Sequence, residues 1–142
     1  MSELKLELIE GEYRTWLDFI VDGESLYDVI SPGSSPESAL SCLTLLYDDE
    51  ELKKALDSLL LRGPADFPDN RRALYVCSMC GDLACGADTV VIEEGENTII
   101  WRDFGWENTY ENDVSISEEI GPFIFDKAQY IGELKDSVAL FK

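Results

Sequence analysis

Three of the four cysteines in this chain lie within nine residues, and their type and spacing could do chemistry. They are Cys77, Cys80 and Cys85, in the segment Cys-Ser-Met-Cys-Gly-Asp-Leu-Ala-Cys-Gly, and the fourth cysteine is Cys42. Thiolates bind zinc, and a structural zinc ion takes four tetrahedral ligands. Cys42, or Asp82 within the segment, would have to supply the fourth ligand.

The first part of this segment is similar to half of a zinc ribbon, but no second Cys-x-x-Cys knuckle follows it. A thioredoxin-like pair would need a strand that runs into a helix, whereas both flanks here predict strands. Cysteine is also among the residue types most often buried. We therefore expect no metal, with Cys77 buried in a strand and Gly81 and Gly86 shaping a turn. Zinc bound by the four cysteines, or thiol redox chemistry, is the alternative.

The residue types that are missing argue against an enzyme. The chain has no histidine, so neither a Ser-His-Asp nor a Cys-His nucleophile system can be built in its usual form. It also lacks a Gly-rich phosphate loop and an Asp-rich calcium loop. A binding protein is therefore the expected class.

The charge of the chain indicates what it binds. Its 142 residues include 30 acidic and 11 basic side chains, for a net charge of −19. Such a charge repels nucleic acid, whose binding depends on Lys and Arg at the phosphates, and it disfavours anionic membranes. A net charge of about 2 to 8 in magnitude is enough to keep a small domain soluble. The excess predicts electrostatic steering toward a basic protein.

The expected compartment follows from the N-terminal residues and the hydropathy. The chain begins Met-Ser-Glu-Leu-Lys-Leu-Glu-Leu, which alternates charged and apolar residues and has no apolar segment typical of a signal peptide. No apolar run approaches the length of a membrane span. We expect a cytoplasmic protein.

Acidic and aromatic side chains are interleaved between residues 90 and 120. Aromatic anchors surrounded by acids are typical of an interface with a basic partner. A strand buries one face, so Trp101 and Phe104 are expected in the core. The candidate partner-binding residues are Glu93, Glu94, Glu96, Asp103, Trp106, Glu107, Tyr110, Glu111 and Asp113.

Two helices are predicted from their capping motifs. Asp48 and Glu51 form a capping box ahead of an apolar stripe at helical spacing, and a Gly-Pro pair ends that helix. Asp126 and Gln129 repeat the motif before a second stripe near the C-terminus. Alternating patterns predict strands at residues 4–8, 13–21, 73–77, 89–93 and 98–104. The predicted fold is α+β, a single acidic domain over residues 1–142 with a mostly antiparallel sheet packed by at least two helices.

Three motifs follow one another between residues 73 and 134. A Cys-Gly-Asp-Leu-Ala-Cys-Gly turn begins at Cys80, an Ile-Trp-Arg-Asp-Phe strand at Ile100, and a Gly-Pro-Phe-Ile-Phe-Asp helix start at Gly121. Together they resemble a family of small bacterial proteins that carries no established activity. The resemblance implies a bacterial origin and one shared fold, and it supplies no catalytic residues.

The expected function is that of an acidic binding protein, most concretely an immunity protein that neutralises a basic bacterial toxin. A nuclease toxin must be basic to hold its polyanionic substrate, so an acidic inhibitor is its electrostatic complement. The alternative is a small cysteine-cluster protein that binds zinc or acts in thiol redox. A third interpretation is an α+β protein without a defined ligand.

Overall fold

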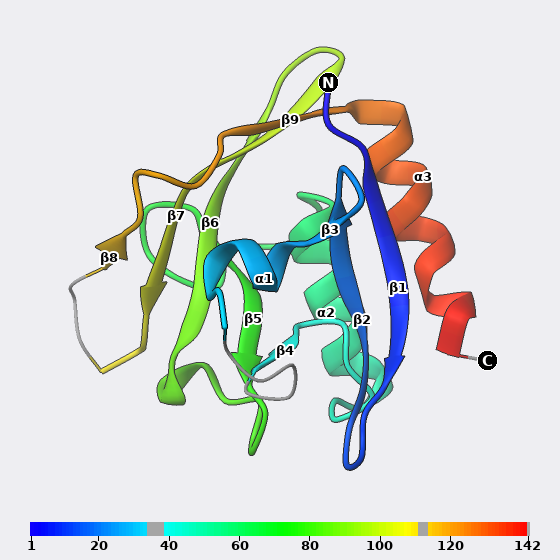
Figure 1. Cartoon of the computed structure of the whole chain (residues 1–142), viewed down its shortest axis with the longest axis vertical. Coiled ribbons are helices and arrows are strands. Elements are labelled where there is room, and N and C mark those ends of the chain that lie inside the picture. The colour runs from blue at the N-terminus through cyan, green and yellow to red at the C-terminus, as the bar shows by residue number, and fades with distance from the viewer. Residues whose placement is uncertain (34–38, 111–113, 142) are drawn as a thin grey trace.

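The computed structural model describes residues 1–33, 39–110 and 114–141, and its strands form two antiparallel sheets (Figure 1). The smaller sheet has the order β1 (Leu4–Glu10), β2 (Thr15–Val21) and β3 (Glu24–Ser25). The larger sheet contains β4 (Ala39–Ser41), β5 (Arg71–Cys77), β6 (Ala87–Glu94), β7 (Thr98–Glu107) and β8 (Ser115–Ile116), and β9 (Phe123–Asp126) pairs with β7.

The helices lie mainly outside these sheets, as Figure 1 shows for α3 beside β1. The α-helices are α1 (Leu26–Ile30), α2 (Asp49–Leu59) and α3 (Lys127–Ser137), and the short 3₁₀ helices are η1 (Leu83–Cys85) and η2 (Val138–Phe141). Mixed helix and antiparallel sheet confirm the α+β prediction for the described residues. None of the helices there has both the length and the apolar character needed to cross a bilayer.

Both predicted helix starts are confirmed by their hydrogen bonds. Asp48 Oδ1 accepts from the Glu51 amide at 2.8 Å, and Glu51 Oε1 accepts from the Asp48 amide at 3.2 Å, which completes the capping box. At α3, Asp126 accepts from the Gln129 amide at 3.0 Å. Gln129 does not close a second box, because its amide group bonds the backbone of Leu4 in β1 instead.

Helix α3 is therefore tied to the neighbouring strand by side chains as well as by packing. Gln129 Oε1 accepts from the Leu4 amide at 3.1 Å, and Glu133 Oε1 accepts from the Leu6 amide at 2.8 Å. These two strand amides point away from β2 and toward the helix. The C-terminal helix thus docks on the N-terminal strand.

The core lies between the two sheets and the longer helices, with Trp101 of β7 near its centre. Trp101 is fully buried, and its ring meets Phe19 of β2 edge to face at a centroid distance of 5.6 Å. Its indole N–H donates to Tyr130 of α3 at 3.2 Å, and the Tyr130 hydroxyl donates to the Leu59 carbonyl of α2 at 2.7 Å. The expected burial of Trp101 is thus confirmed. Its indole contacts the other sheet and is linked through Tyr130 to two helices.

Several short elements are present that the sequence patterns did not predict. They include α1, β3, β4, β8 and β9, none longer than five residues. Segments this short carry too few residues to show a period, so partners elsewhere in the chain decide their conformation. Strand β9 ends where α3 begins, which is why this region was predicted only as a helix start.

Candidate functional site

The cysteine segment forms a tight turn between β5 and β6. Cys77 is the last residue of β5, and its carbonyl accepts from the Gly81 amide at 2.8 Å. Gly81 has a φ of 68°, in the left-handed region that favours glycine. The 3₁₀ helix η1 follows, capped by Asp82 through the Ala84 amide at 2.9 Å, and it carries Cys85.

This turn brings three sulfur atoms together. The Sγ atoms of Cys77, Cys80 and Cys85 all lie within 4.8 Å of one another, and those of Cys80 and Cys85 are 3.1 Å apart. Cys77 is half-buried, whereas Cys80 and Cys85 are exposed. Cys77 is thus less buried than expected for its strand position, because it ends β5, and the turn carries Cys80 and Cys85 into solvent.

Backbone amides of the turn point at the sulfur atoms. The Met79 amide is the main cause of a lowered pKa at Cys77, with a further contribution from the Cys80 amide. The Asp82 amide donates to Cys80 Sγ at 3.4 Å. Amides that donate to sulfur stabilise the thiolate over the thiol, which favours metal binding and nucleophilic chemistry. At Cys85, by contrast, the hydrogen bond with Cys80 raises the pKa to about 11.

Two side chains from other elements hold the turn in place. The Arg14 guanidinium, at the start of β2, donates to the carbonyl oxygens of Ser78 and Met79 at 3.1 and 3.3 Å. The Tyr47 hydroxyl donates to the Gly81 carbonyl at 2.7 Å. These contacts fix the path of the turn that carries the cysteines.

Gly86 closes the turn against an aromatic ring. Its φ is 117°, and a Cβ atom at this position would lie 2.2 Å from Cζ2 of Trp106. A side chain at residue 86 would therefore displace the indole. The cysteine turn and Trp106 are packed directly on each other.

The residues considered as a fourth ligand are not part of the sulfur cluster. Cys42 is buried next to β5, with its amide donating to the Leu74 carbonyl at 2.8 Å, and burial raises the pKa of its thiol strongly. The Asp82 carboxylate caps η1. Among the described residues, the group able to hold a metal ion consists of Cys77, Cys80 and Cys85. A cavity of about 640 Å³ between α2 and the turn is lined by both Cys42 and Cys80.

Three clustered thiols match the requirements of a soft or borderline cation. With Zn–S bonds of about 2.3 Å, tetrahedral zinc places its sulfur ligands about 3.8 Å apart, which a set of sulfurs within 4.8 Å can reach with small side-chain rotations. Three protein ligands leave one coordination position for water or another donor. The three cysteines could thus bind a metal ion.

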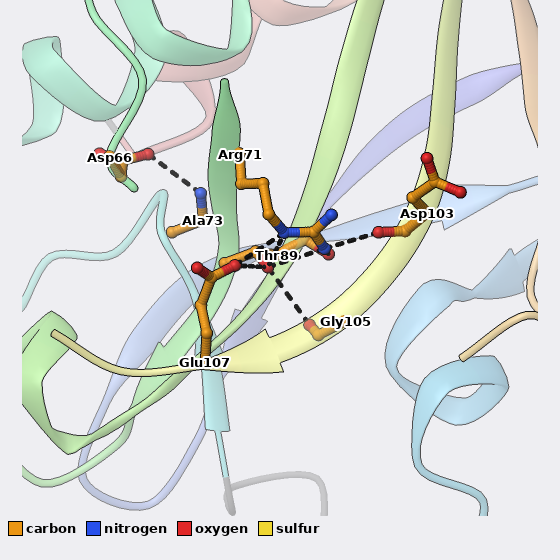
Figure 2. Close-up of polar contacts among 7 residues, drawn as sticks. All are labelled: Asp66, Arg71, Ala73, Thr89, Asp103, Gly105 and Glu107. Carbon is orange, nitrogen blue, oxygen red and sulfur yellow. Dashed lines mark hydrogen bonds and ion pairs between the residues drawn. The ribbon is translucent and has the colours of Figure 1, made fainter. Parts of the chain in front are cut away.

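The predicted partner-binding residue Glu107 is buried, in contrast to the expectation. Its carboxylate accepts from Arg71 Nε at 2.8 Å, and both side chains are only 4% exposed (Figure 2). The Thr89 hydroxyl donates to the same carboxylate, and Arg71 Nη2 donates to the Asp103 carbonyl at 2.6 Å. Glu107 is therefore removed from the predicted surface, because it neutralises a buried arginine.

The other predicted residues of this set do not form one surface. Glu93, Glu94 and Glu96 lie at the β6–β7 turn, whereas Trp106 and Tyr110 lie at or beyond the far end of β7. Eight residues of extended strand span about 26 Å at about 3.3 Å per residue. The two ends of the hairpin thus lie too far apart to form one compact surface.

Most acids near this turn also have a basic neighbour in the chain. Glu93 lies 3.7 Å from Arg102, which also pairs with Asp103, and Glu94 lies 2.8 Å from Lys127. These pairs are exposed, so each contributes little to stability, but they reduce the local negative charge. Glu111 and Asp113 lie outside the described residues.

Sequence reasoning missed Arg14 and Asp88. Arg14, the residue before β2, donates to the cysteine turn, and Asp88 lies on β6 opposite Trp106. Both are ordinary charged residues in their segments, so no local pattern marks them. Only the strand pairing brings them to these positions.

Comparisons with protein-family models, curated proteins and solved structures found no match for this chain. The resemblance to a family of small bacterial proteins thus stays a prediction.

Proposed function

We propose that the protein binds one zinc ion through Cys77, Cys80 and Cys85. The observation that carries this proposal is the approach of the three Sγ atoms to within 4.8 Å of one another. Amide donors to the sulfur atoms of Cys77 and Cys80 support it, because a zinc site requires deprotonated thiols. The fourth ligand is then a water molecule or a donor from a partner.

The test is elemental analysis of protein purified in reducing buffer and dialysed against zinc, followed by metal-free buffer. The wild type is expected to keep about one zinc per chain, because bound zinc prefers thiolate ligands. Cys80→Ser is expected to lose it, and since Cys80 is exposed the variant should fold normally. Binding of Co²⁺, read as thiolate-to-metal absorption, gives a second measurement.

Cys42→Ser is the matched control, because Cys42 lies outside the sulfur cluster. It should retain zinc like the wild type. Wild-type protein that is free of zinc after this treatment would overturn the proposal. If Cys80 and Cys85 then formed a disulfide under mild oxidation, thiol redox chemistry would be favoured in its place.

A second candidate function is that of an acidic binding protein for a basic partner, most concretely an immunity protein that neutralises a bacterial toxin. Two exposed aromatic side chains favour it: Trp106 is 45% exposed and Tyr110 is 84% exposed. Large aromatic residues dominate the energetics of many interfaces. With a net charge of −19, the chain would attract a basic partner over long range.

The test uses the product of the gene immediately upstream of the one that encodes this chain. Its C-terminal domain should stop growth when expressed alone and be harmless when this chain is co-expressed. Replacing both Trp106 and Tyr110 by alanine should weaken the complex at least about tenfold, because each is expected to act as an anchor. Tyr13→Ala, another exposed aromatic at 77%, is the control and should bind normally. A harmless upstream product, or equal binding by all variants, would contradict this function.

A further inference from the structure

A second cavity, of about 260 Å³, lies where the end of α1 meets strands β6, β7 and β8. Its lining residues include Asp88 and Trp106, together with Ser31 and Ser115. Asp88 and Trp106 are directly opposite each other in the β6–β7 register. Side chains opposite each other in antiparallel strands point to the same face, so the carboxylate and the indole share one cavity wall.

The Asp88 carboxylate is half-buried on β6. Within the described part of the chain it makes no hydrogen bond and no ion pair. Burial is also the cause that raises the pKa of Asp88 to about 6. The group is still mainly ionised at neutral pH, yet it is less well hydrated than a surface carboxylate. A cation that entered the cavity would therefore gain a charge-assisted hydrogen bond at a low desolvation cost for Asp88.

Trp106 adds an aromatic surface beside this carboxylate. The indole packs against Gly86, where a Cβ would lie 2.2 Å from Cζ2. The ring remains 45% exposed. Ammonium and guanidinium groups bind over the face of tryptophan more strongly than over other aromatic rings.

We propose that this cavity binds the side chain of a lysine or arginine from a basic protein partner, with Asp88 as the anionic contact and Trp106 as the aromatic wall. The inference rests on the second function proposed above. Sites for drug-sized ligands have volumes of about 300–1,000 Å³, so a cavity of about 260 Å³ suits a single side chain. The net charge of −19 favours a cationic occupant.

The experiment titrates ¹⁵N-labelled protein with N-acetyl-lysine methylamide and with N-acetyl-arginine methylamide. The indole N–H of Trp106 and the amides of Thr89 and Gly105, which also line the cavity, should shift and saturate. N-acetyl-norleucine methylamide, which lacks the charge, should cause no saturating shift. Absence of a saturating shift with both cationic probes would overturn the inference.

Asp88→Asn is the decisive variant, because it removes the charge and keeps the shape. It should fold normally, since the carboxylate holds no partner among the described residues. Its affinity for the cationic probes should fall about tenfold or more, as expected for loss of a charge-assisted contact. Asp103→Asn, at an exposed acid paired with Arg102, is the control and should bind like the wild type. Equal binding by Asp88→Asn and the wild type would overturn the inference.

Failure of this inference and failure of the second proposed function give different results. If the upstream gene product binds the wild type and Asp88→Asn equally, the cavity is not part of the interface and the partner function stands. If the cationic probes bind through Asp88 but the upstream product does not bind, the cavity chemistry stands and that partner is wrong.

Discussion

Replacing Glu107 by alanine is expected to lower the free energy of unfolding by about 3–5 kcal/mol. The change leaves the Arg71 guanidinium buried without its counter-charge, in a site where both side chains are only 4% exposed. The Thr89 hydroxyl loses its nearer acceptor at the same time and keeps only the Gly105 carbonyl at 3.5 Å. Urea unfolding at neutral pH, followed by circular dichroism, measures the change through the transition midpoint.

Two further variants show whether the uncompensated charge is the cause. Glu93→Ala removes an exposed acid whose nearest base is 3.7 Å away, and it should change stability by no more than about 0.5 kcal/mol. The double variant Arg71→Met, Glu107→Met should lose less than Glu107→Ala alone, because no buried charge remains. This explanation would be contradicted if the double variant were less stable than Glu107→Ala. It would also be contradicted if Glu107→Ala unfolded at the same urea concentration as the wild type.

Replacing Trp101 by alanine is expected to cost about 3–5 kcal/mol as well. The indole is fully buried against Phe19 and Phe125, and it donates the hydrogen bond that connects β7 to Tyr130. Its removal leaves a cavity at the junction of both sheets and two helices. Thermal or urea unfolding would show a lowered midpoint, and a loss of cooperativity would show that the sheets have separated.

Trp106→Ala is the matched control, since it is the same substitution five residues further along the same strand. Its side chain is 45% exposed, so its removal should cost well under half as much as that of Trp101, in proportion to the apolar area it buries. Equal losses at both positions would mean that Trp106 has a structural role. Substitution of Trp106 would then change both stability and binding, so the binding test would have to use Tyr110→Ala alone.

The parts of the fold that could be predicted from the sequence are those set by local signals. The capping box of Asp48 and Glu51 depends on residues three apart, and α2 begins where it places the start. Strand β1 begins with the alternation of buried and exposed residues that its sequence shows. Strands β4 and β8 have three and two residues, and pairing with distant strands determines them, so no local pattern could show them.

The burial of Glu107 escaped prediction because β7 does not alternate regularly. Asp103 has a φ of 53°, and the pairing of β7 with β6 shifts register between Thr89 and Val91. Such an irregularity changes which later side chains face inward. Alternation counted along the strand from Trp101 therefore does not give the burial of residues beyond Asp103. The counter-charge of Glu107 comes from Arg71, which is far away in the sequence.

The candidate metal site was predictable in its members and not in its environment. Spacing alone brings Cys77, Cys80 and Cys85 into one short segment. Their exposure and the direction of the amides depend on the path of the turn, which Gly81 and the contacts of Arg14 define. The three cysteines could thus be identified from the sequence, whereas the approach of their sulfur atoms is visible only in the structure.

The hydrogen bonds from α3 to β1 also cover backbone groups at the edge of a sheet. Strand β1 is the outer strand of its sheet, and such strands present free amides that can template the addition of another chain. Gln129 and Glu133 occupy the amides of Leu4 and Leu6, and the Gln129 side chain also donates to the Leu4 carbonyl. The C-terminal helix α3 thus covers the open edge of β1. Truncating the chain before α3 would expose this strand edge to pairing with another chain.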